Sequence, residues 1–349
     1  MRSKALFRRG RTLGVAQKVL LVGLVWLVGI SVLHLRVNRV ESAGTVVSMG
    51  YMPVISNLSA PILDRLTRNS TRLRFRAIKF ASFAEMVEAF RNDHIQAAFL
   101  IAPLSIVLKQ QGEEIRVVYI GNRHESTLVA RKGLHIKGIE DLAGKTVAVP
   151  MKYSGHHIAL LRLIDEKGLT GRVNIVEMNP PDMAASLTAG SLDAYFVGEP
   201  FAAQTLRSGD AELVHYVEDV WDGFICNLLI VKRSFIERHA AETKAMVHAA
   251  VRSGIWARHH LDAAADLAAA YWNQPVDIVT HALSTPANRI VFDKFTPRQD
   301  EMQYLADLMV DFDLLENSRI DGLVDDGFAR SADLDGVTSL ATIMDPESL

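Results

Sequence analysis

The feature that most constrains the fold is an alternation of two kinds of segment that begins after Gly44. Short runs rich in β-branched and aromatic residues alternate with segments of helical periodicity. The runs at residues 95–101 and 115–120 are apolar almost throughout, which is typical of strands buried on both faces of a parallel sheet. Parallel neighbours need a crossover, and a helix is the usual one. The alternation therefore predicts an α/β fold with mostly parallel sheets.

The same reading places individual elements. Strands are expected at residues 45–49, 73–80, 95–101, 115–120, 145–149, 173–177 and 194–197. Helices are expected at residues 59–68, from Ser82, from Ser154 to Gly168, and from Pro180. Beyond residue 226 the pattern is helical, at 234–273 and 297–315, and residues 316–349 form a C-terminal segment with a loose end.

An internal repeat indicates how these elements are grouped. When the chain is shifted by 97 positions, residues 82–103 align with 179–200 without a gap, and Phe99 meets Phe196. Any two helix–strand units share some similarity, so chance remains an alternative. We favour two similarly built α/β lobes, one after the other.

Charge is distributed unevenly along the 349 residues. The formal net charge is −2, but residues 1–43 hold eight of the 38 Lys and Arg and one of the 40 Asp and Glu, so the remainder carries about −9. Nucleic-acid binding depends largely on neutralising phosphates. An acidic body without a basic run therefore argues against nucleic acid as a partner.

The basic residues precede an uncharged apolar stretch at residues 19–35. Seventeen residues is short for a membrane span and long for the apolar part of a signal peptide, so both interpretations are open. Cleavage of a signal peptide after Ala43 would need a small residue two positions earlier, where this chain has Glu41. This mismatch favours an uncleaved anchor. In either case the positive-inside rule places the body in the periplasm or another extracytoplasmic space, with residues 19–35 as the possible inner-membrane anchor.

Ligands of open α/β sheets collect outside the carboxyl ends of the strands. Four strand-to-helix turns qualify, at residues 50–59, 102–105, 152–157 and 198–201. The third is the best candidate, because Ser154 offers a hydroxyl, Gly155 permits close approach, and the helix start presents free amides. An N-cap with surface histidines is the plainer alternative.

Other candidate site residues carry chemistry that is less specific. Glu199 would place a carboxylate at the mouth of the second lobe, or would simply be a first-turn acid, and Trp221 could form an aromatic wall. His156 and His157 diverge on a helix and Cys226 is the only cysteine, so no metal site and no cofactor are expected. No sequence motif of a known enzyme class is present, so we expect a protein that is not an enzyme.

Several motifs together resemble a known family. They are a Gly-Tyr-Met-Pro turn at residues 50–53, the unit at residues 141–150, the helix start at Ser154, and Glu199-Pro200-Phe201. In this order they resemble the solute-binding proteins of nitrate/sulfonate/bicarbonate-type ABC importers, which include taurine binders and binders of thiamine-pyrimidine precursors.

The resemblance implies a two-lobed periplasmic-binding-protein-like fold of type 2, preceded by a transmembrane or signal helix. Residues 1–43 would be the leader, residues 44–123 and 226–315 a discontinuous lobe 1, and residues 124–225 lobe 2. The chain would cross between the lobes near residues 122–128 and 224–231. Ligand contacts would come from Tyr51, Asn57, Ser59, Pro103, Ser105, Ser154, Gly155, His156, His157, Glu199 and, more weakly, Trp221.

The function that follows is capture of a small anionic, zwitterionic or heteroaromatic solute between two lobes. The partners would be that small molecule and an ABC permease with its ATPase, and the binding protein itself would be a monomer. A membrane-tethered ligand sensor on the same fold is the alternative, and an enzyme on the same scaffold is a third possibility.

Overall fold

The computed structural model describes residues 14–38 and 44–344, and it divides into two compact units, Met1–Gly44 and Thr45–Leu349. In the first unit, α1 (Val15–Asn38) includes an apolar stretch, Val15–Leu33, that is long enough to cross a membrane, a property that signal sequences share. The basic residues up to Arg11 and the candidate cleavage position at Ala43 lie outside the described residues.

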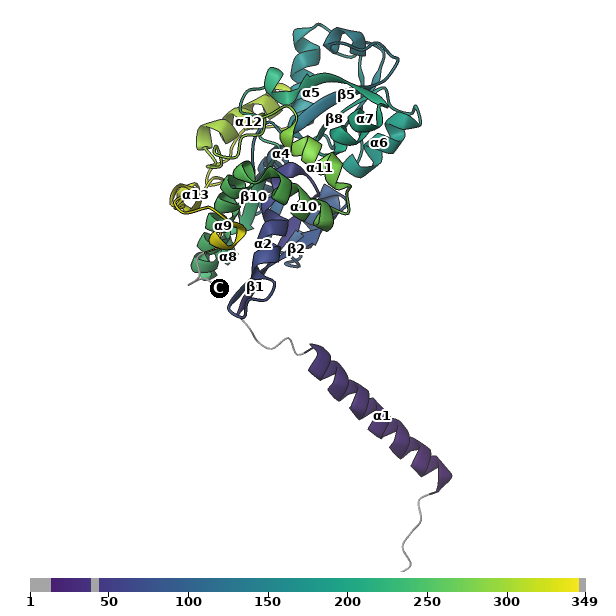
Figure 1. Ribbon diagram of the computed structural model, residues 1–349, viewed down its shortest axis with the longest axis vertical. Helices are drawn as coiled ribbons and strands as arrows, with labels where there is room; N and C mark the ends of the chain where they lie inside the picture. Colours follow the sequence, from purple (N-terminus) through teal and green to yellow (C-terminus); the bar gives the residue numbers. More distant parts are fainter. Residues whose placement is uncertain (1–13, 39–43, 345–349) are drawn as a thin grey trace, which may run out of the picture. The chain divides into compact units, whose positions relative to one another are not determined.

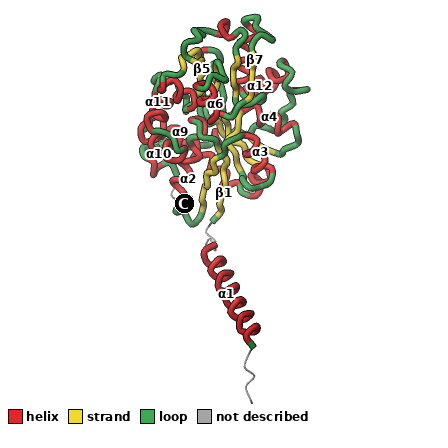
Figure 2. The backbone as a smooth tube through the Cα atoms, turned by 90° about the vertical axis from the view of Figure 1, so that its right-hand side faces the viewer, coloured by secondary structure: helices red, strands yellow, loops and turns green. Residues whose placement is uncertain are grey.

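The second unit contains two five-stranded sheets (Figures 1 and 2). The first has the order β2 (Leu73–Lys79), β1 (Thr45–Tyr51), β3 (Ala97–Ile101), β10 (Asn227–Lys232), β4 (Ile115–Ile120). The second has the order β7 (Asn174–Glu177), β6 (Thr146–Val149), β8 (Ala194–Gly198), β5 (Ser126–Arg131), β9 (Ala211–Tyr216). In each sheet one strand, β10 or β5, is antiparallel to both neighbours. The predicted parallel sheets are therefore mixed, because each receives a strand that enters from the direction of the other sheet.

Helices flank both sheets. They are α2 (Ser59–Thr67), α3 (Phe83–Arg91), α4 (Ala102–Gln110), α5 (Gly155–Glu166), α6 (Pro180–Thr188), α7 (Phe201–Ser208), α8 (Arg233–Arg238), α9 (Ala240–His259), α10 (Leu261–Trp272), α11 (Val276–Ser284), α12 (Gln299–Asp311) and α13 (Gly327–Arg330). The helix expected at residues 234–273 is interrupted at His239 and His260, whose non-helical backbone separates α8, α9 and α10. We call the first sheet with α2–α4 and α8–α13 lobe 1, and the second sheet with α5–α7 lobe 2.

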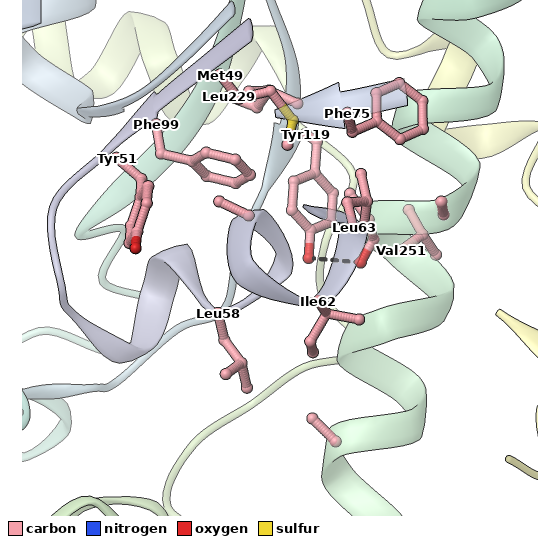
Figure 3. Packing of buried hydrophobic residues seen from close by; sticks show 14 of the residues in the cluster. Met49, Tyr51, Leu58, Ile62, Leu63, Phe75, Phe99, Tyr119, Leu229 and Val251 are labelled. Atoms are coloured by element: carbon pink, nitrogen blue, oxygen red, sulfur yellow. Dashed lines mark hydrogen bonds between the residues drawn. The ribbon is translucent and has the colours of Figure 1, made fainter. Parts of the chain in front are cut away.

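The core of lobe 1 joins one face of its sheet to α2 and α9. Figure 3 shows side chains from β1, β2 and β3 meeting those of the two helices, among them Met49, Phe75, Phe99, Ile62, Leu63 and Val251. Tyr119 of β4 reaches between the helices, where its hydroxyl lies 3.1 Å from both the Ser59 hydroxyl and the Ala250 carbonyl oxygen. Burial of these side chains is what fixes α2, and with it the loop after β1, against the sheet.

The chain passes between the sheets twice, after β4 and again before β10. The segment after residue 315 lies against lobe 1: Leu323 accepts a backbone hydrogen bond from Val117, and the guanidinium of Arg252 donates to the carbonyls of Thr342 and Ile343. Because Thr45–Leu349 forms one compact unit, the lobe boundaries near residues 123 and 225 stay a prediction.

Candidate functional site

The turns at the carboxyl ends of the two sheets meet and enclose a groove of about 420 Å³. Its lobe 1 wall is the start of α3, and its lobe 2 wall comprises the turns after β6 and β7. The lining residues are Ser82, Phe83, Ala84, Pro150, Met151, Glu177, Met178, Asn179 and Asp182. The site is therefore where a ligand of two facing α/β sheets is expected to lie.

Further from this groove, the loop after β1 is tied to lobe 2 and to the first crossing by polar contacts. The backbone N–H of Ile55 donates to the carbonyl of Glu199 at 2.8 Å, and the Asn122 amide donates to the Ile55 carbonyl at 3.1 Å. The Asn57 side chain donates to Met52 and accepts from Asn227. Asn57, a sequence candidate, thus holds the shape of this loop.

The other lobe 1 candidates also contact the protein itself. Tyr51 is buried in the lobe 1 core, and the Ser59 hydroxyl donates to the Ala250 carbonyl. Pro103 and Ser105 lie in the first turn of α4, which begins where β3 ends, and the Ser105 hydroxyl donates to the carbonyl of Ala102 at 2.6 Å. None of these four predicted contacts is among the residues that line the groove.

The α5 start is capped as the sequence indicates. The Ser154 hydroxyl accepts from the His157 N–H at 3.1 Å, and His157 Nδ1 lies 2.7 Å from the Lys152 carbonyl. A Cβ on Gly155 would lie 2.8 Å from the Phe224 ring, so only glycine fits there without a shift of that ring.

His156 is buried between the rings of Phe196 and Phe224, with ring centroids 5.4 Å away in both cases. Its Nε2 lies 2.9 Å from the Ser126 hydroxyl, and its Nδ1 has no hydrogen-bond partner. Burial lowers the pKa of His156 to about 3, so the imidazole is neutral near pH 7.

Glu199 is buried and fully engaged. Its carboxylate accepts from the Thr127 hydroxyl at 2.7 Å and from the Ala203 N–H at 2.8 Å, and it lies 3.7 Å from the guanidinium of Arg289. Burial raises the pKa of Glu199, and the positive charge of Arg289 opposes this effect. Arg289 is therefore a basic neighbour of the Glu199 carboxylate.

Arg289 was missed by sequence reasoning, because it lies between helices in a stretch without periodicity. It extends from lobe 1 into lobe 2, where it donates to both oxygens of Glu218, at 2.8 and 3.1 Å, and to the Ser126 carbonyl at 2.7 Å. Its guanidinium carbon also lies 4.2 Å from the centre of the Tyr216 ring. Arg289 therefore connects the lobes through charge, hydrogen bonds and a cation–π contact.

Glu125, on the first crossing, is a second buried acid that the sequence did not single out. Its Oε2 accepts from the Glu199 N–H at 2.7 Å, whereas its Oε1 and the nearby Ser56 hydroxyl have no hydrogen-bond partner of ordinary geometry. Burial raises the pKa of Glu125 to about 7. The polar run at residues 125–127, at the start of β5, was the available signal.

Trp221 lies away from the groove, beside Phe224 and Tyr304. It shares a different cavity with Gly155. Among residues 14–38 and 44–344, no three His, Cys, Asp or Glu side chains gather in a way that could hold a metal ion.

Sequence comparison identifies the family. The model of the NMT1-like family matches residues 45–272, about two thirds of the chain. The chain belongs to the NMT1-like family. A curated relative of this NMT1-like protein is the taurine-binding periplasmic protein of Escherichia coli (strain K12), which is 31% identical over 179 residues, 50% of this chain and 54% of that one. The chain therefore spans about half the length of the curated relatives it matches.

Solved structures show that the NMT1-like chain has a periplasmic-binding-protein fold. The ligand-binding component of an ABC-type import system from Staphylococcus aureus superposes with a TM-score of 0.76 at 20% identity, covering 83% of this chain and 99% of that one. The alkanesulfonate-binding protein SsuA from Xanthomonas axonopodis pv. citri, bound to MOPS, gives a TM-score of 0.68 at 17% identity, covering 80% and 96%. The desulfurization enzyme DszB has the same fold, with a TM-score of 0.60 at 16% identity, covering 82% and 97%.

Proposed function

We propose that this chain is the solute-binding component of an ABC importer and captures a small anionic, zwitterionic or heteroaromatic solute between its lobes. The observation that carries the proposal is the groove between the carboxyl edges of two sheets with the same strand order. Closure of two such lobes over a solute removes it from water and changes the surface that a membrane partner contacts. The taurine-binding relative agrees with this solute class.

The chemistry around the groove favours a ligand with both charges. The starts of α3 and α6 border it, and helix starts favour an anionic group. The groove lining also includes the acidic side chains of Glu177 and Asp182, which favour a ligand with a positively charged group. An aminosulfonate supplies a sulfonate for the helix starts and an ammonium group for the acceptors.

The cellular setting belongs to the same proposal. We place Thr45–Leu349 outside the cytoplasm, with α1 as its signal or anchor, and we expect an ABC permease and its ATPase as partners. The support is the apolar length of α1 and the periplasmic relative.

We further propose that the protein catalyses no reaction, although DszB shares its fold. The thiol of Cys226 lies 4.0 Å from His156 Nε2, an arrangement that could suggest a nucleophile and its base. Burial, however, raises the pKa of Cys226 and lowers that of His156 to about 3, so both groups stay neutral near pH 7. A buried neutral thiol is a poor nucleophile.

Thermal unfolding of the full chain in detergent, with and without candidate solutes, tests the binding function. We expect taurine or an alkanesulfonate to raise the melting temperature by mass action. Met151→Trp, which fills the groove, should abolish that rise, whereas Leu213→Trp, on an exposed position of β9, should retain it. The proposal fails if taurine, alkanesulfonates, nitrate, pyrimidines and amino acids all leave the melting temperature of the unsubstituted protein unchanged.

A further inference from the structure

A second cavity, of about 160 Å³, lies between α12 and the segment that leads back into lobe 1. Its walls include Gly155, Trp221, Asp222, Phe224, Glu301 and Tyr304. None of these residues lines the groove described above. The cavity is therefore a separate site, with walls from lobe 2, from the second crossing and from lobe 1.

Aromatic rings form much of this cavity. The Trp221 ring makes edge-to-face contacts with Phe224 and Tyr304, at centroid distances of 5.6 and 6.3 Å. The guanidinium carbon of Arg162 lies 5.1 Å from the centre of the Trp221 ring, so this ring already takes part in one cation–π contact. Tyr304 is half exposed, which leaves part of its ring accessible from solvent.

Asp222 places an exposed negative charge at the rim, while Arg123 and Arg162 contact the cavity residues Glu301 and Trp221 from outside the lining. Within the described part of the chain, the cavity lining includes Asp222 and Glu301 but no basic side chain. Glu301 is paired with Arg123 at 3.0 Å, whereas the Asp222 carboxylate is 91% exposed and lies 3.5 Å from His124 Nε2. Burial lowers the pKa of His124, so this imidazole is neutral near pH 7 and leaves the charge of Asp222 uncompensated.

We propose that this cavity binds the cationic group of a small organic ammonium or guanidinium compound. Aromatic faces attract such cations through their quadrupole, and a nearby carboxylate adds Coulomb attraction. Tyr304 belongs to lobe 1 and Gly155 to lobe 2, so an occupant contacts both lobes at once. This inference goes beyond the proposed uptake function, because the site shares no residue with the groove.

Calorimetric titration of the full chain in detergent tests the site with choline as the probe. Its neutral carbon isostere, 3,3-dimethyl-1-butanol, separates charge from shape, and NaCl at equal ionic strength controls for screening. We expect saturable binding of choline and much weaker binding of the isostere. Tyr304→Leu should weaken choline binding about three- to tenfold, and Asp222→Asn should weaken it by a smaller factor. Asp262→Asn, an exposed acid on α10, should leave it unchanged.

Two further measurements separate this site from the groove. Met151→Trp should leave choline binding intact, and Tyr304→Leu should leave the melting-temperature rise caused by taurine intact. Equal affinity for choline and its isostere, or insensitivity to both Tyr304→Leu and Asp222→Asn, would overturn the proposal. So would the absence of any choline signal beyond that of NaCl. Loss of choline binding in Met151→Trp would place the cation in the groove instead.

Discussion

The two copies of the repeat occupy the same place in their sheets but end in different chemistry. In lobe 1, α3 is followed by β3, and in lobe 2, α6 is followed by β8, each strand being the third of its sheet. At the end of β3 the chain enters α4 through apolar residues. At the end of β8 it places the buried carboxylate of Glu199 beside Arg289. The scaffold is repeated, whereas the charge at its carboxyl edge is not.

The difference follows from what each feature depends on. A helix and a buried strand need only the right apolar spacing, so both copies can keep it: Met86 and Met183 have the same position, and both are fully buried. A buried carboxylate needs a specific partner, and Arg289 supplies it from a segment outside the repeat. The difference in charge between the two copies therefore depends on Arg289, which belongs to the part of lobe 1 that follows the second crossing.

The largest expected effect comes from removing that partner. Arg289→Leu leaves Glu199 buried without its nearby positive charge and deprives Glu218 of two charged hydrogen bonds. We expect the free energy of unfolding near pH 7 to fall by about 3–5 kcal/mol in urea titrations.

The matched control is Arg207→Leu, which removes an exposed ion pair with Asp277 between α7 and α11 and should cost at most about 1 kcal/mol. Adding Glu199→Gln to Arg289→Leu should recover part of the loss. Equal effects of the two arginine substitutions would show that the buried charges do not distinguish lobe 2.

The second prediction concerns the part that is repeated. Met86→Ala and Met183→Ala each remove a fully buried side chain from equivalent positions of α3 and α6, so each should lower the free energy of unfolding by about 2–5 kcal/mol. Glu88→Ala, on the exposed face of α3, should change it by no more than about 0.5 kcal/mol. A large loss at one methionine and a negligible loss at the other would contradict the equivalence of the two copies.

The third prediction uses pH to test Glu125. Its folded pKa of about 7 exceeds the ordinary value of 4.5, so between pH 4.5 and 7 the unfolded chain releases a proton that the folded protein keeps. The stability of the unsubstituted protein should therefore fall over this range, by up to about 3 kcal/mol for this group. In Glu125→Gln this pH-dependent contribution to stability should be absent. Urea unfolding at several pH values between 4.5 and 7 measures it.

His156 provides the opposing control. Its folded pKa of about 3 lies below 6.5, so the unfolded chain takes up a proton first and stability falls as pH drops from 6.5 to 3. Between pH 4.5 and 6.5 the two groups offset one another. The stability of Glu125→Gln should then rise with pH, relative to the unsubstituted protein, and that of His156→Gln should fall. Parallel pH profiles for all three proteins would show that neither group titrates as its burial requires.

The sequence was sufficient for features that depend on local pattern. Apolar spacing and turn residues predict the strands that pair in parallel within each sheet. Local cap and proline signals predict the helix starts at Ser154 and Pro180. It was insufficient where contacts join distant segments. Arg289 and Thr127 are 162 positions apart, and neither carries a pattern that indicates the other. For the same reason Glu199 could be singled out, but its partner could not be identified.

The smallest expected effect separates the two helix starts. The Ser82 hydroxyl accepts from the Glu85 N–H at 3.2 Å, whereas Asn179 makes no side-chain cap to α6. Pro180 and Pro181 carry no N–H, and the Asp182 N–H donates to the Asn179 carbonyl, so α6 needs no such cap.

Ser82→Ala should therefore lower the free energy of unfolding by about 1 kcal/mol, and Asn179→Ala should leave it nearly unchanged. Both positions lie at the rim of the groove, so the measurement is made without solute. Equal losses would mean that Asn179 caps α6 in solution as Ser82 caps α3, and that the two copies resemble one another more closely than their contacts indicate. A loss at Ser82 alone would show that the α3 start depends on a side-chain cap and that the α6 start does not.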